Sequence, residues 1–231
     1  MSSLTHGPVA TTLERLHEEA ADTDRAHVEA LMAAVEAPGG SLTQLIADII
    51  ASEQRDYDAV SRENADYFLA VSPAYGRFLY MMARATGARR IVEFGTSMGI
   101  STIYLAAAVH DNGGGLLIGS ELQSSKVARA RANVAAAGLA SLVDIRVGDA
   151  LETLKEVGGD VDLLLIDGAF ALYLPVLRLI EPRLRKGAVV LAENAFDQAY
   201  LDYVRDPANG YLSQSLALDE GRGNEFAIRT C

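Results

Sequence analysis

The stretch that decides the fold is Val92-Glu93-Phe94-Gly95-Thr96-Ser97-Met98-Gly99-Ile100-Ser101-Thr102. An apolar run ends here in two glycines spaced G-x-x-x-G, and a segment with helical periodicity follows. Gly95 and Gly99 allow a tight turn and a close approach of the backbone to a ligand. The spacing is neither the G-x-G-x-x-G of dinucleotide sites nor a phosphate-binding loop, because no Gly-Lys-Ser/Thr follows. The stretch therefore predicts a strand, a ligand-binding turn and a helix, and disfavours a nicotinamide-dependent dehydrogenase.

The same alternation of strand and helix continues to the end of the chain. The strand-like runs are Ile91–Phe94, Leu116–Gly119, Val143–Val147, Val161–Ile166, Ala188–Ala192, Tyr211–Leu218 and Glu225–Thr230. The expected helices between them are Ile100–His110, Ser124–Ala137, Ala150–Glu156, Phe170–Leu184 and Phe196–Val204. Runs that are apolar on both faces and are followed by helices are typical of parallel strands covered by helices. The last two runs flank a glycine-containing loop and predict a hairpin. We expect an α/β, Rossmann-like, seven-stranded and mostly parallel sheet that ends in an antiparallel hairpin.

The first 70 residues contain no strand-like run. Apolar residues between Leu13 and Val35 recur at helical spacing and predict one amphipathic helix, which Pro38-Gly39-Gly40 ends. Ser41 with Gln44 predicts a capping box at the start of a second helix. Ser72 and Pro73 suit the N-cap and first position of a third helix. We expect residues 1–70 to form a helical extension, either a lid or a dimer interface, and residues 71–231 to form the ligand-binding domain.

Composition narrows the class of function. The chain has 231 residues and a net charge of −11, which repels phosphate backbones and disfavours a nucleic-acid partner. No run of about 18 apolar residues exists, so no membrane span is expected. No secretory pattern is visible in residues 1–10. Cys231 is the single cysteine, so we expect no disulfide framework and a cytoplasmic location. An enzyme that acts on a small molecule fits all these limits.

Polar residues follow the next two expected strands. Ligands of open α/β sheets bind at the carboxyl ends of the strands. Glu121 follows the second strand, where a carboxylate can accept both hydroxyls of a ribose. The third strand ends in Gly148-Asp149-Ala150, which is well placed to meet an adenine. These positions predict an adenosine-containing ligand.

The sequence resembles a class I S-adenosylmethionine-dependent methyltransferase. The resemblance lies in Glu93-x-Gly95-x-x-x-Gly99, Glu121, Gly148-Asp149-Ala150 and the terminal hairpin. Residues 89–194, with Val71-Ser72-Pro73, are similar to the small-molecule O-methyltransferases of the catechol and caffeoyl-CoA type. The resemblance covers residues 68–230 and implies S-adenosylmethionine as cofactor and S-adenosylhomocysteine as product. It also implies the contacts of the cofactor, namely Glu93 and Gly95 at the methionine part, Ser72 and Ser101 at its polar tail, Glu121 at the ribose, and Asp149 with Ala150 at the adenine.

The acceptor side departs from the family pattern. The resemblance implies a Mg²⁺ ion held by two Asp and one Asn, which activates the acceptor hydroxyl, and a Lys that acts as base. Asp167, also expected beside the cofactor, stands at the first metal-ligand position, and Asn194 matches the last. Glu193 replaces the second Asp, and Phe170 replaces the Lys. Either Asp167, Glu193 and Asn194 still bind a metal and carry catalysis, or the site is metal-free and Phe170 packs an aromatic acceptor.

A metal-free site needs another base or an acceptor that is already ionised. The candidate bases, none with a spacing argument, are His6, His17, His27, Asp197 and Glu225. Arg222 in the hairpin loop is a candidate for binding an acceptor carboxylate. The predicted function is methylation of an oxygen of a small aromatic metabolite, and the resemblance adds a homodimer and a place in secondary metabolism. The alternatives are a cofactor-binding module with lost or altered methyl transfer and a small-molecule N-methyltransferase.

Overall fold

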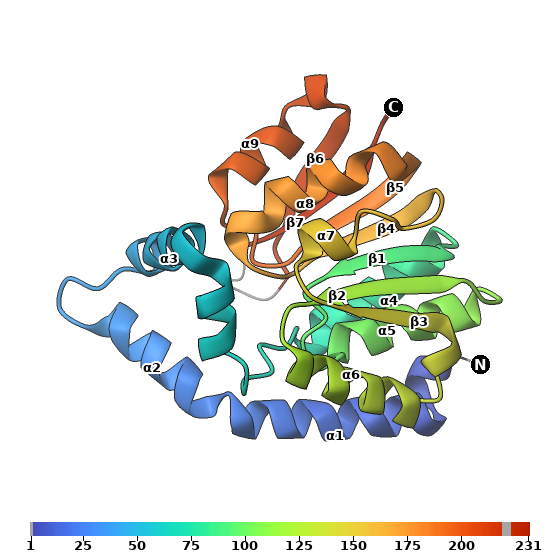
Figure 1. Ribbon diagram of the computed structural model, residues 1–231, viewed down its shortest axis with the longest axis horizontal. Helices are drawn as coiled ribbons and strands as arrows, with labels where there is room; N and C mark the ends of the chain where they lie inside the picture. The colour runs from blue at the N-terminus through green and yellow to red at the C-terminus, as the bar shows by residue number, and fades with distance from the viewer. Residues whose placement is uncertain (1, 219–222) are drawn as a thin grey trace.

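The seven strands form one sheet in the order β3-β2-β1-β4-β5-β7-β6 (Figure 1). The computed structural model describes residues 2–218 and 223–231. Strands β1 to β5 are parallel to one another, whereas β7 is antiparallel to both β5 and β6. The bounds are β1 Arg90–Phe94, β2 Leu116–Glu121, β3 Val143–Val147, β4 Val161–Ile166, β5 Leu184–Ala192, β6 Tyr211–Leu216 and β7 Asn224–Arg229. The predicted α/β fold with its terminal hairpin is confirmed.

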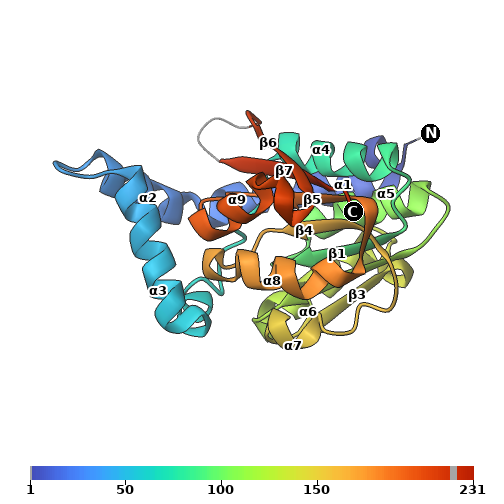
Figure 2. The same ribbon diagram turned by 90° about the horizontal axis from the view of Figure 1, so that it is seen from above.

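Helices cover both faces of the sheet. The α-helices are α1 Gly7–Thr23, α2 Arg25–Glu36, α3 Leu42–Glu63, α4 Pro73–Ala85, α5 Ile100–Asp111, α6 Ser124–Ala136, α7 Ala150–Thr153, α8 Tyr173–Ile180 and α9 Gln198–Arg205. The short 3₁₀ helices are η1 Ser3–Thr5, η2 Ala140–Leu142, η3 Phe170–Leu172, η4 Glu181–Arg183 and η5 Pro207–Asn209. One core cluster joins α1, α4, α5 and α6 to the sheet, and a second joins α8 and α9 to the other face. Figure 2 shows α4 and α8 on opposite sides of the strands.

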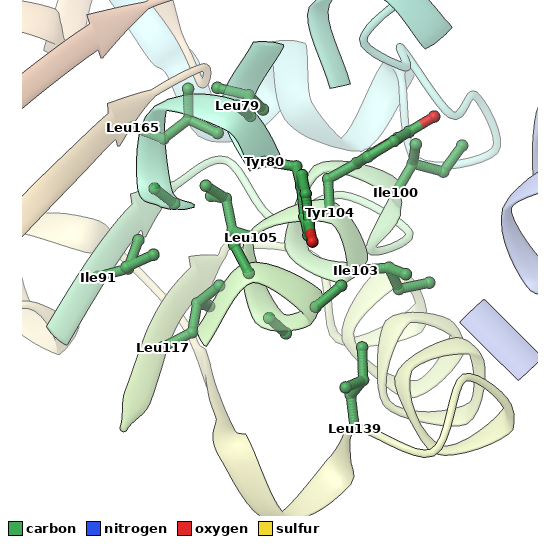
Figure 3. Packing of buried hydrophobic residues seen from close by; sticks show 14 of the residues in the cluster. Leu79, Tyr80, Ile91, Ile100, Ile103, Tyr104, Leu105, Leu117, Leu139 and Leu165 are labelled. Atoms are coloured by element: carbon green, nitrogen blue, oxygen red, sulfur yellow. The ribbon is translucent and has the colours of Figure 1, made fainter. Parts of the chain in front are cut away.

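Helix α5 is buried around almost its whole circumference. Every residue from Ile100 to Val109 is buried, because α4 and α1 cover the side of α5 that faces away from the sheet. Figure 3 shows Leu105 among Leu79 of α4 and the strand residues Ile91 and Leu117. Dense packing at this point fixes the start of α5, and with it the turn that precedes this helix.

The single helix predicted between Leu13 and Val35 is wrong, because the chain breaks at Asp24 into α1 and α2. The carboxylate of Asp24 accepts hydrogen bonds from Phe68 N and Leu69 N, both at 2.8 Å. Helix α1 buries an apolar stripe against α5 and α6, whereas α2 buries no residue. The break therefore lets α1 follow the domain while α2 and α3 project from it (Figure 1).

Two other local predictions need correction. Ser41 precedes α3 but makes no side-chain cap bond, and Gln44 donates to Asp48 Oδ1 (2.9 Å) instead of closing a capping box. The helix predicted over Phe170–Leu184 ends at Ile180, because Pro182 has no N–H to continue it and Leu184 already pairs in the sheet.

The cap predicted at Ser72 is confirmed, since its Oγ accepts from Tyr75 N at 3.0 Å. Arg222 lies outside the described residues. In the part of the chain that the structure describes, no helix is long and apolar enough to cross a membrane.

Candidate functional site

A cavity of about 760 Å³ lies where the loops after β1 to β4 meet helix α3. This volume is in the range of small-molecule sites. Of the residues predicted for the site, those on the cavity wall are Gly95, Ser101, Glu121, Asp149, Ala150, Asp167 and Asn194. Ser72, Glu93 and Glu193 do not line it. The topology therefore gathers most of the predicted residues around one space, as expected for the carboxyl edge of a parallel sheet.

The glycine loop passes against the end of β4. Gly95 has φ +95°, and a Cβ on it would lie 1.9 Å from Asp167 O, so that no larger residue fits. Gly95 N and Thr96 N both donate to Ser120 O at 3.1 Å. The turn is thus held between β2 and β4, with its backbone on the cavity wall.

Glu93 is buried behind this turn instead of on the cavity wall. Its carboxylate accepts hydrogen bonds from Ser101 Oγ (2.8 Å), Thr96 Oγ1 (2.9 Å) and Thr102 Oγ1 (2.5 Å). Burial raises the pKa of Glu93, and the three hydroxyl donors oppose this rise. Glu93 therefore ties the loop to the first turn of α5. The direct contact with the methionine part that the resemblance implied is not supported by this placement.

Glu121 is held on the wall by backbone amides. Its Oε2 accepts from Ser97 N at 2.8 Å and its Oε1 from Gln123 N at 2.9 Å. Each oxygen of an ionised carboxylate has two acceptor positions, so this geometry leaves capacity for the two hydroxyls of a ribose. Lys126, which the sequence reasoning missed, is buried beside the loop and donates to Ser97 Oγ at 3.3 Å. Burial lowers the pKa of Lys126, and the charge of Glu121 counteracts that effect.

Asp149 joins the third strand end to the helical extension. Its Oδ1 caps α7 by accepting from Leu151 N at 2.8 Å, and its Oδ2 accepts from Tyr57 OH of α3 at 2.7 Å. Gln123 Nε2 also donates to Ser61 Oγ of α3 at 3.0 Å. Helix α3 therefore covers this end of the cavity. Tyr57 had no signal in the local sequence, because its partner lies 92 positions away.

Aromatic rings form the other end of the cavity. Phe170 begins η3 directly after β4, and its ring lies 5.7 Å from the ring of Tyr173 and 5.9 Å from that of Phe196. Phe170, Tyr173 and Asp167 all line the cavity. Burial, together with the charges of Asp167 and Glu193, holds the pKa of the Tyr173 hydroxyl well above its ordinary value. The side chain at the family's lysine position thus contributes an apolar wall.

Glu193 and Asn194 are paired with each other. Asn194 Nδ2 donates to Glu193 Oε2, and Glu193 is 2% exposed. One carboxylate oxygen of Glu193 is therefore engaged by Asn194, which shares the cavity wall with Asp167. Within the described ranges, no three His, Cys, Asp or Glu side chains gather to hold a metal ion. A Mg²⁺ ion held by Asp167, Glu193 and Asn194 needs near-octahedral geometry, so Glu193 Oε2 would have to exchange its bond to Asn194 for the metal.

Glu53 of α3 is an acidic residue on the cavity wall that the sequence reasoning missed. It is 6% exposed, and its Oε2 accepts from Ala171 N at 3.1 Å. Burial raises the pKa of Glu53 to about 7, against the opposing effect of the backbone amides of Ala171 and Phe170. The only sequence signal was an acidic residue on an amphipathic helix. Such a signal does not tell whether the carboxylate is buried or exposed to solvent.

The five bases proposed from the sequence have different surroundings. His27 lines the cavity, with its ring 4.4 Å from that of Tyr67. The other four do not line it: His6 is exposed before α1, His17 bonds Tyr104 OH, Asp197 caps α9, and Glu225 pairs with Arg205.

The strand order and the loop after β1 define the class I methyltransferase architecture, and comparisons with known proteins agree. Residues 92–195 match the family described as a methyltransferase domain. A catechol O-methyltransferase from Niastella koreensis is 32% identical over 161 residues, which cover 67% of this chain and 72% of that protein. A catechol O-methyltransferase from Mycobacterium tuberculosis is 37% identical over 127 residues, covering 54% of this chain and 57% of the relative.

Two solved structures share the fold at more than 25% identity. Cofactor-bound Rv0187 from MTB has a TM-score of 0.65 at 26% identity, with 87% of this chain and 95% of that chain covered. The O-methyltransferase TomG from Streptomyces achromogenes, solved in complex with SAM, has a TM-score of 0.64 at 28% identity, with 74% and 86% covered. The chain belongs to the family of S-adenosylmethionine-dependent O-methyltransferases that act on small molecules.

Proposed function

We propose that this chain transfers a methyl group from S-adenosylmethionine to a hydroxyl group of a small aromatic compound. The observation that carries the proposal is one continuous cavity that runs from Asp149 and Glu121, past Gly95, to Phe170. One end offers acceptors for an adenosine, and the other offers aromatic walls. A cavity with both ends can hold donor and acceptor together, which is the main requirement of a transfer reaction between two substrates.

In this proposal the cofactor follows the strand ends in order. Asp149 and Ala150 bind the adenine, Glu121 accepts the ribose hydroxyls, and Gly95 with Ser101 borders the methionine part. When bound, S-adenosylmethionine supplies an electrophilic methyl group, whose bond to sulfur breaks with the electron pair left on sulfur as the acceptor oxygen forms its new bond to carbon. Glu93 and Ser72 act indirectly, since Glu93 holds the loop after β1 and the Ser72 hydroxyl caps α4.

The proposed acceptor lies against Phe170 and Tyr173. Their rings favour an aromatic compound by edge and face contacts. Asp167 and Asn194 are polar groups on the same stretch of wall, and in this proposal they orient the hydroxyl that is methylated. The relatives named catechol O-methyltransferase support hydroxylated aromatics as the first compounds to test.

We further propose that acceptor activation does not depend on a Mg²⁺ ion held by Asp167, Glu193 and Asn194. The bond between Asn194 and Glu193 supports this, because it engages the side chain that would supply the middle ligand. The test is a calorimetric titration of Mg²⁺ into protein saturated with S-adenosylhomocysteine, with Asp167→Asn as control. Binding at sub-millimolar metal that disappears in the control would restore the metal-dependent alternative.

The transfer itself is tested by incubating the protein with S-adenosylmethionine and a panel of phenols, catechols and aromatic amines, followed by mass spectrometry. We expect methylated hydroxyls. Methylation of amines alone would favour an N-methyltransferase. Tight binding of S-adenosylhomocysteine without any methylated product would favour a cofactor-binding module, the alternative that Phe170 at the lysine position suggests.

We also propose a homodimer in which α2 and α3 contribute to the interface, besides covering the cavity. Val28, Met32 and Leu42 are apolar and about half-exposed on these two helices, which supports a covered surface. Light scattering should give the mass of a dimer for the wild type and of a monomer for Met32→Glu. The cytoplasmic location and the role in secondary metabolism stay predictions from the sequence.

A further inference from the structure

The acceptor end lacks the base that the family uses, since Phe170 replaces the lysine. A neutral phenol is a weak nucleophile, and a base within hydrogen-bond reach speeds its attack. Helix α3 brings a carboxylate to the same turn, because Glu53 bonds the backbone of η3 directly beside Phe170. We propose that Glu53 is the general base that accepts the proton of the acceptor hydroxyl. This inference deepens the proposed methyl transfer and rests on it.

Helix α3 is bent at the place that this role requires. Asp56 has non-helical dihedral angles (φ −162°, ψ 83°), so the helix continues in a new direction after it. The bend is visible in Figure 1, where the two parts of α3 point in different directions. Glu53 precedes the bend and reaches η3, while Tyr57 follows it and reaches Asp149. One helix thereby contacts both the acceptor end and the adenosine end of the cavity.

The carboxylate of Glu53 keeps capacity for a substrate. Its hydrogen-bond donors in the structure are backbone N–H groups of η3, at Ala171 (Oε2, 3.1 Å) and at Phe170. An ionised carboxylate offers about four acceptor positions, so two stay available to a hydroxyl in the cavity. The backbone bonds fix the orientation of the side chain, as a base that must meet a bound acceptor requires.

The surroundings of Glu53 favour uptake of a proton. Within residues 2–218 and 223–231, no Lys or Arg forms an ion pair with Glu53, so its buried charge has no cationic partner. A buried carboxylate without a cation favours its neutral form. The other titratable groups that line the cavity are Asp48, Tyr57 and Glu63 on α3, His27 on α2, Tyr67, Glu121, Lys126, Asp149, and Asp167 with Tyr173 after β4. The charge of Glu53 also contributes to the raised pKa of Tyr173.

The proton step is balanced as follows. The O–H bond of the acceptor breaks, its electron pair stays on oxygen and forms the bond to the methyl carbon, and the proton moves to the Glu53 carboxylate. Glu53 releases this proton to solvent when the products leave. A group with a pKa near the working pH serves both steps, and the raised pKa of Glu53 meets this condition.

The first test measures proton acceptance without turnover. Binding of 4-nitrocatechol to the complex of the protein with S-adenosylhomocysteine is measured by calorimetry at about pH 8, where both the free compound and Glu53 are mostly ionised, in buffers that differ in ionisation enthalpy. We expect uptake of about one proton on binding to the wild type, because the bound phenolate and the Glu53 carboxylate share a proton, and no uptake on binding to Glu53→Gln. The matched control is Asp58→Asn, which removes a half-exposed carboxylate of α3 that pairs with Arg62 and does not line the cavity, and it should behave as the wild type. Absence of proton uptake by the wild type overturns the inference, even if the protein methylates other acceptors.

The second test separates a base from a structural cap. Gln at position 53 can still accept the bond from Ala171 N, so a purely structural role would leave the kinetics almost unchanged. We expect Glu53→Gln to lower kcat about 10²- to 10⁴-fold for catechol and much less for 4-nitrocatechol, which ionises more readily. Equal losses for both acceptors overturn the inference, as does a pH profile that keeps its acid limb in Glu53→Gln and loses it in His27→Gln. Absence of methylation in the wild type, with the Glu53-dependent proton uptake still present, refutes the proposed transfer and leaves the proton acceptance by Glu53 established.

Discussion

Replacing Glu53 by Gln should make the protein more stable at alkaline pH. The glutamate is 6% exposed and its pKa is raised from 4.5 to about 7, chiefly by burial. A tenfold change in proton affinity corresponds to about 1.4 kcal/mol, so ionisation of Glu53 in the folded protein costs about 3 kcal/mol more than in the unfolded chain. Gln has the same size and keeps an acceptor for Ala171 N, and it carries no charge to bury.

The sign of the pH dependence follows from proton uptake. The folded state holds a proton on Glu53 between the two pKa values, while the unfolded state has already lost it. The stability of the wild type therefore falls as the pH rises from about 4.5 to about 7, and the full penalty is present above that range. Glu53→Gln has no such loss, so its advantage over the wild type should grow by about 3 kcal/mol across this interval.

Urea unfolding of the wild type, Glu53→Gln and the control Asp58→Asn, repeated at several pH values from about 4 to about 9, measures this difference. Other titrating groups cancel in the comparison, because both proteins contain them. Asp58→Asn should show no such trend, since the side chain of Asp58 is half-exposed and pairs with Arg62 at the surface. If the difference between Glu53→Gln and the wild type stays constant within about 0.5 kcal/mol, the size expected of neutral surface changes, the burial argument for Glu53 is refuted.

Three further predictions concern the cofactor end. Glu121→Ala should weaken binding of S-adenosylhomocysteine by about 1–3 kcal/mol, because buried hydroxyls lose a charged acceptor, and an unchanged Kd in calorimetry would contradict the ribose contact. Gly95→Ala should abolish cofactor binding or folding, since its Cβ would lie 1.9 Å from a carbonyl oxygen. Gly138 also has a positive φ (+76°) but has open space around it, so Gly138→Ala is the control and should lower the unfolding free energy by only about 1 kcal/mol. If Gly95→Ala lowers the unfolding free energy by the same amount, backbone strain, and not the contact with the carbonyl oxygen, explains its effect. Tyr57→Phe should speed amide hydrogen exchange in the second half of α3 severalfold, and unchanged exchange would show that its hydrogen bond to the third strand end does not hold the helix closed.

The sheet could be predicted from the sequence because its information is local. The central parallel strands are largely apolar on both faces, so a run such as Val161–Ile166 differs from its flanks without reference to any other segment. The break between α1 and α2 could not be predicted in the same way. The apolar spacing continues past Asp24, and the chain breaks there because the Asp24 carboxylate binds the amides of Phe68 and Leu69. That contact depends on the folded arrangement.

The residues of the candidate site also fall into two groups, those that could be predicted from the local sequence and those that could not. Glu121, Asp149 and Asp167 follow successive strands, and a parallel sheet brings strand ends to one edge whatever the details of packing. Their positions along the chain therefore predicted their positions in space. Glu53 and Tyr57 reach the same cavity from a bent helix, and periodicity does not tell where such a helix docks. The sequence also could not show that Glu93 is buried behind the loop, because a carboxylate at a strand end can turn either way.

The departures from the family pattern at the acceptor end are linked by electrostatics. A lysine at position 170 would lie beside Glu53 and would pair with its carboxylate, which lowers the pKa of an acid and removes its ability to act as a base near neutral pH. Phe170 leaves the Glu53 charge without a cation and keeps its pKa high. The same ring supplies an apolar wall for an acceptor. The absence of a lysine at position 170 is therefore consistent with the proposed role of Glu53. Because Glu53 belongs to α3, the position of the proposed base depends on the contacts that hold this helix against η3 and the third strand end.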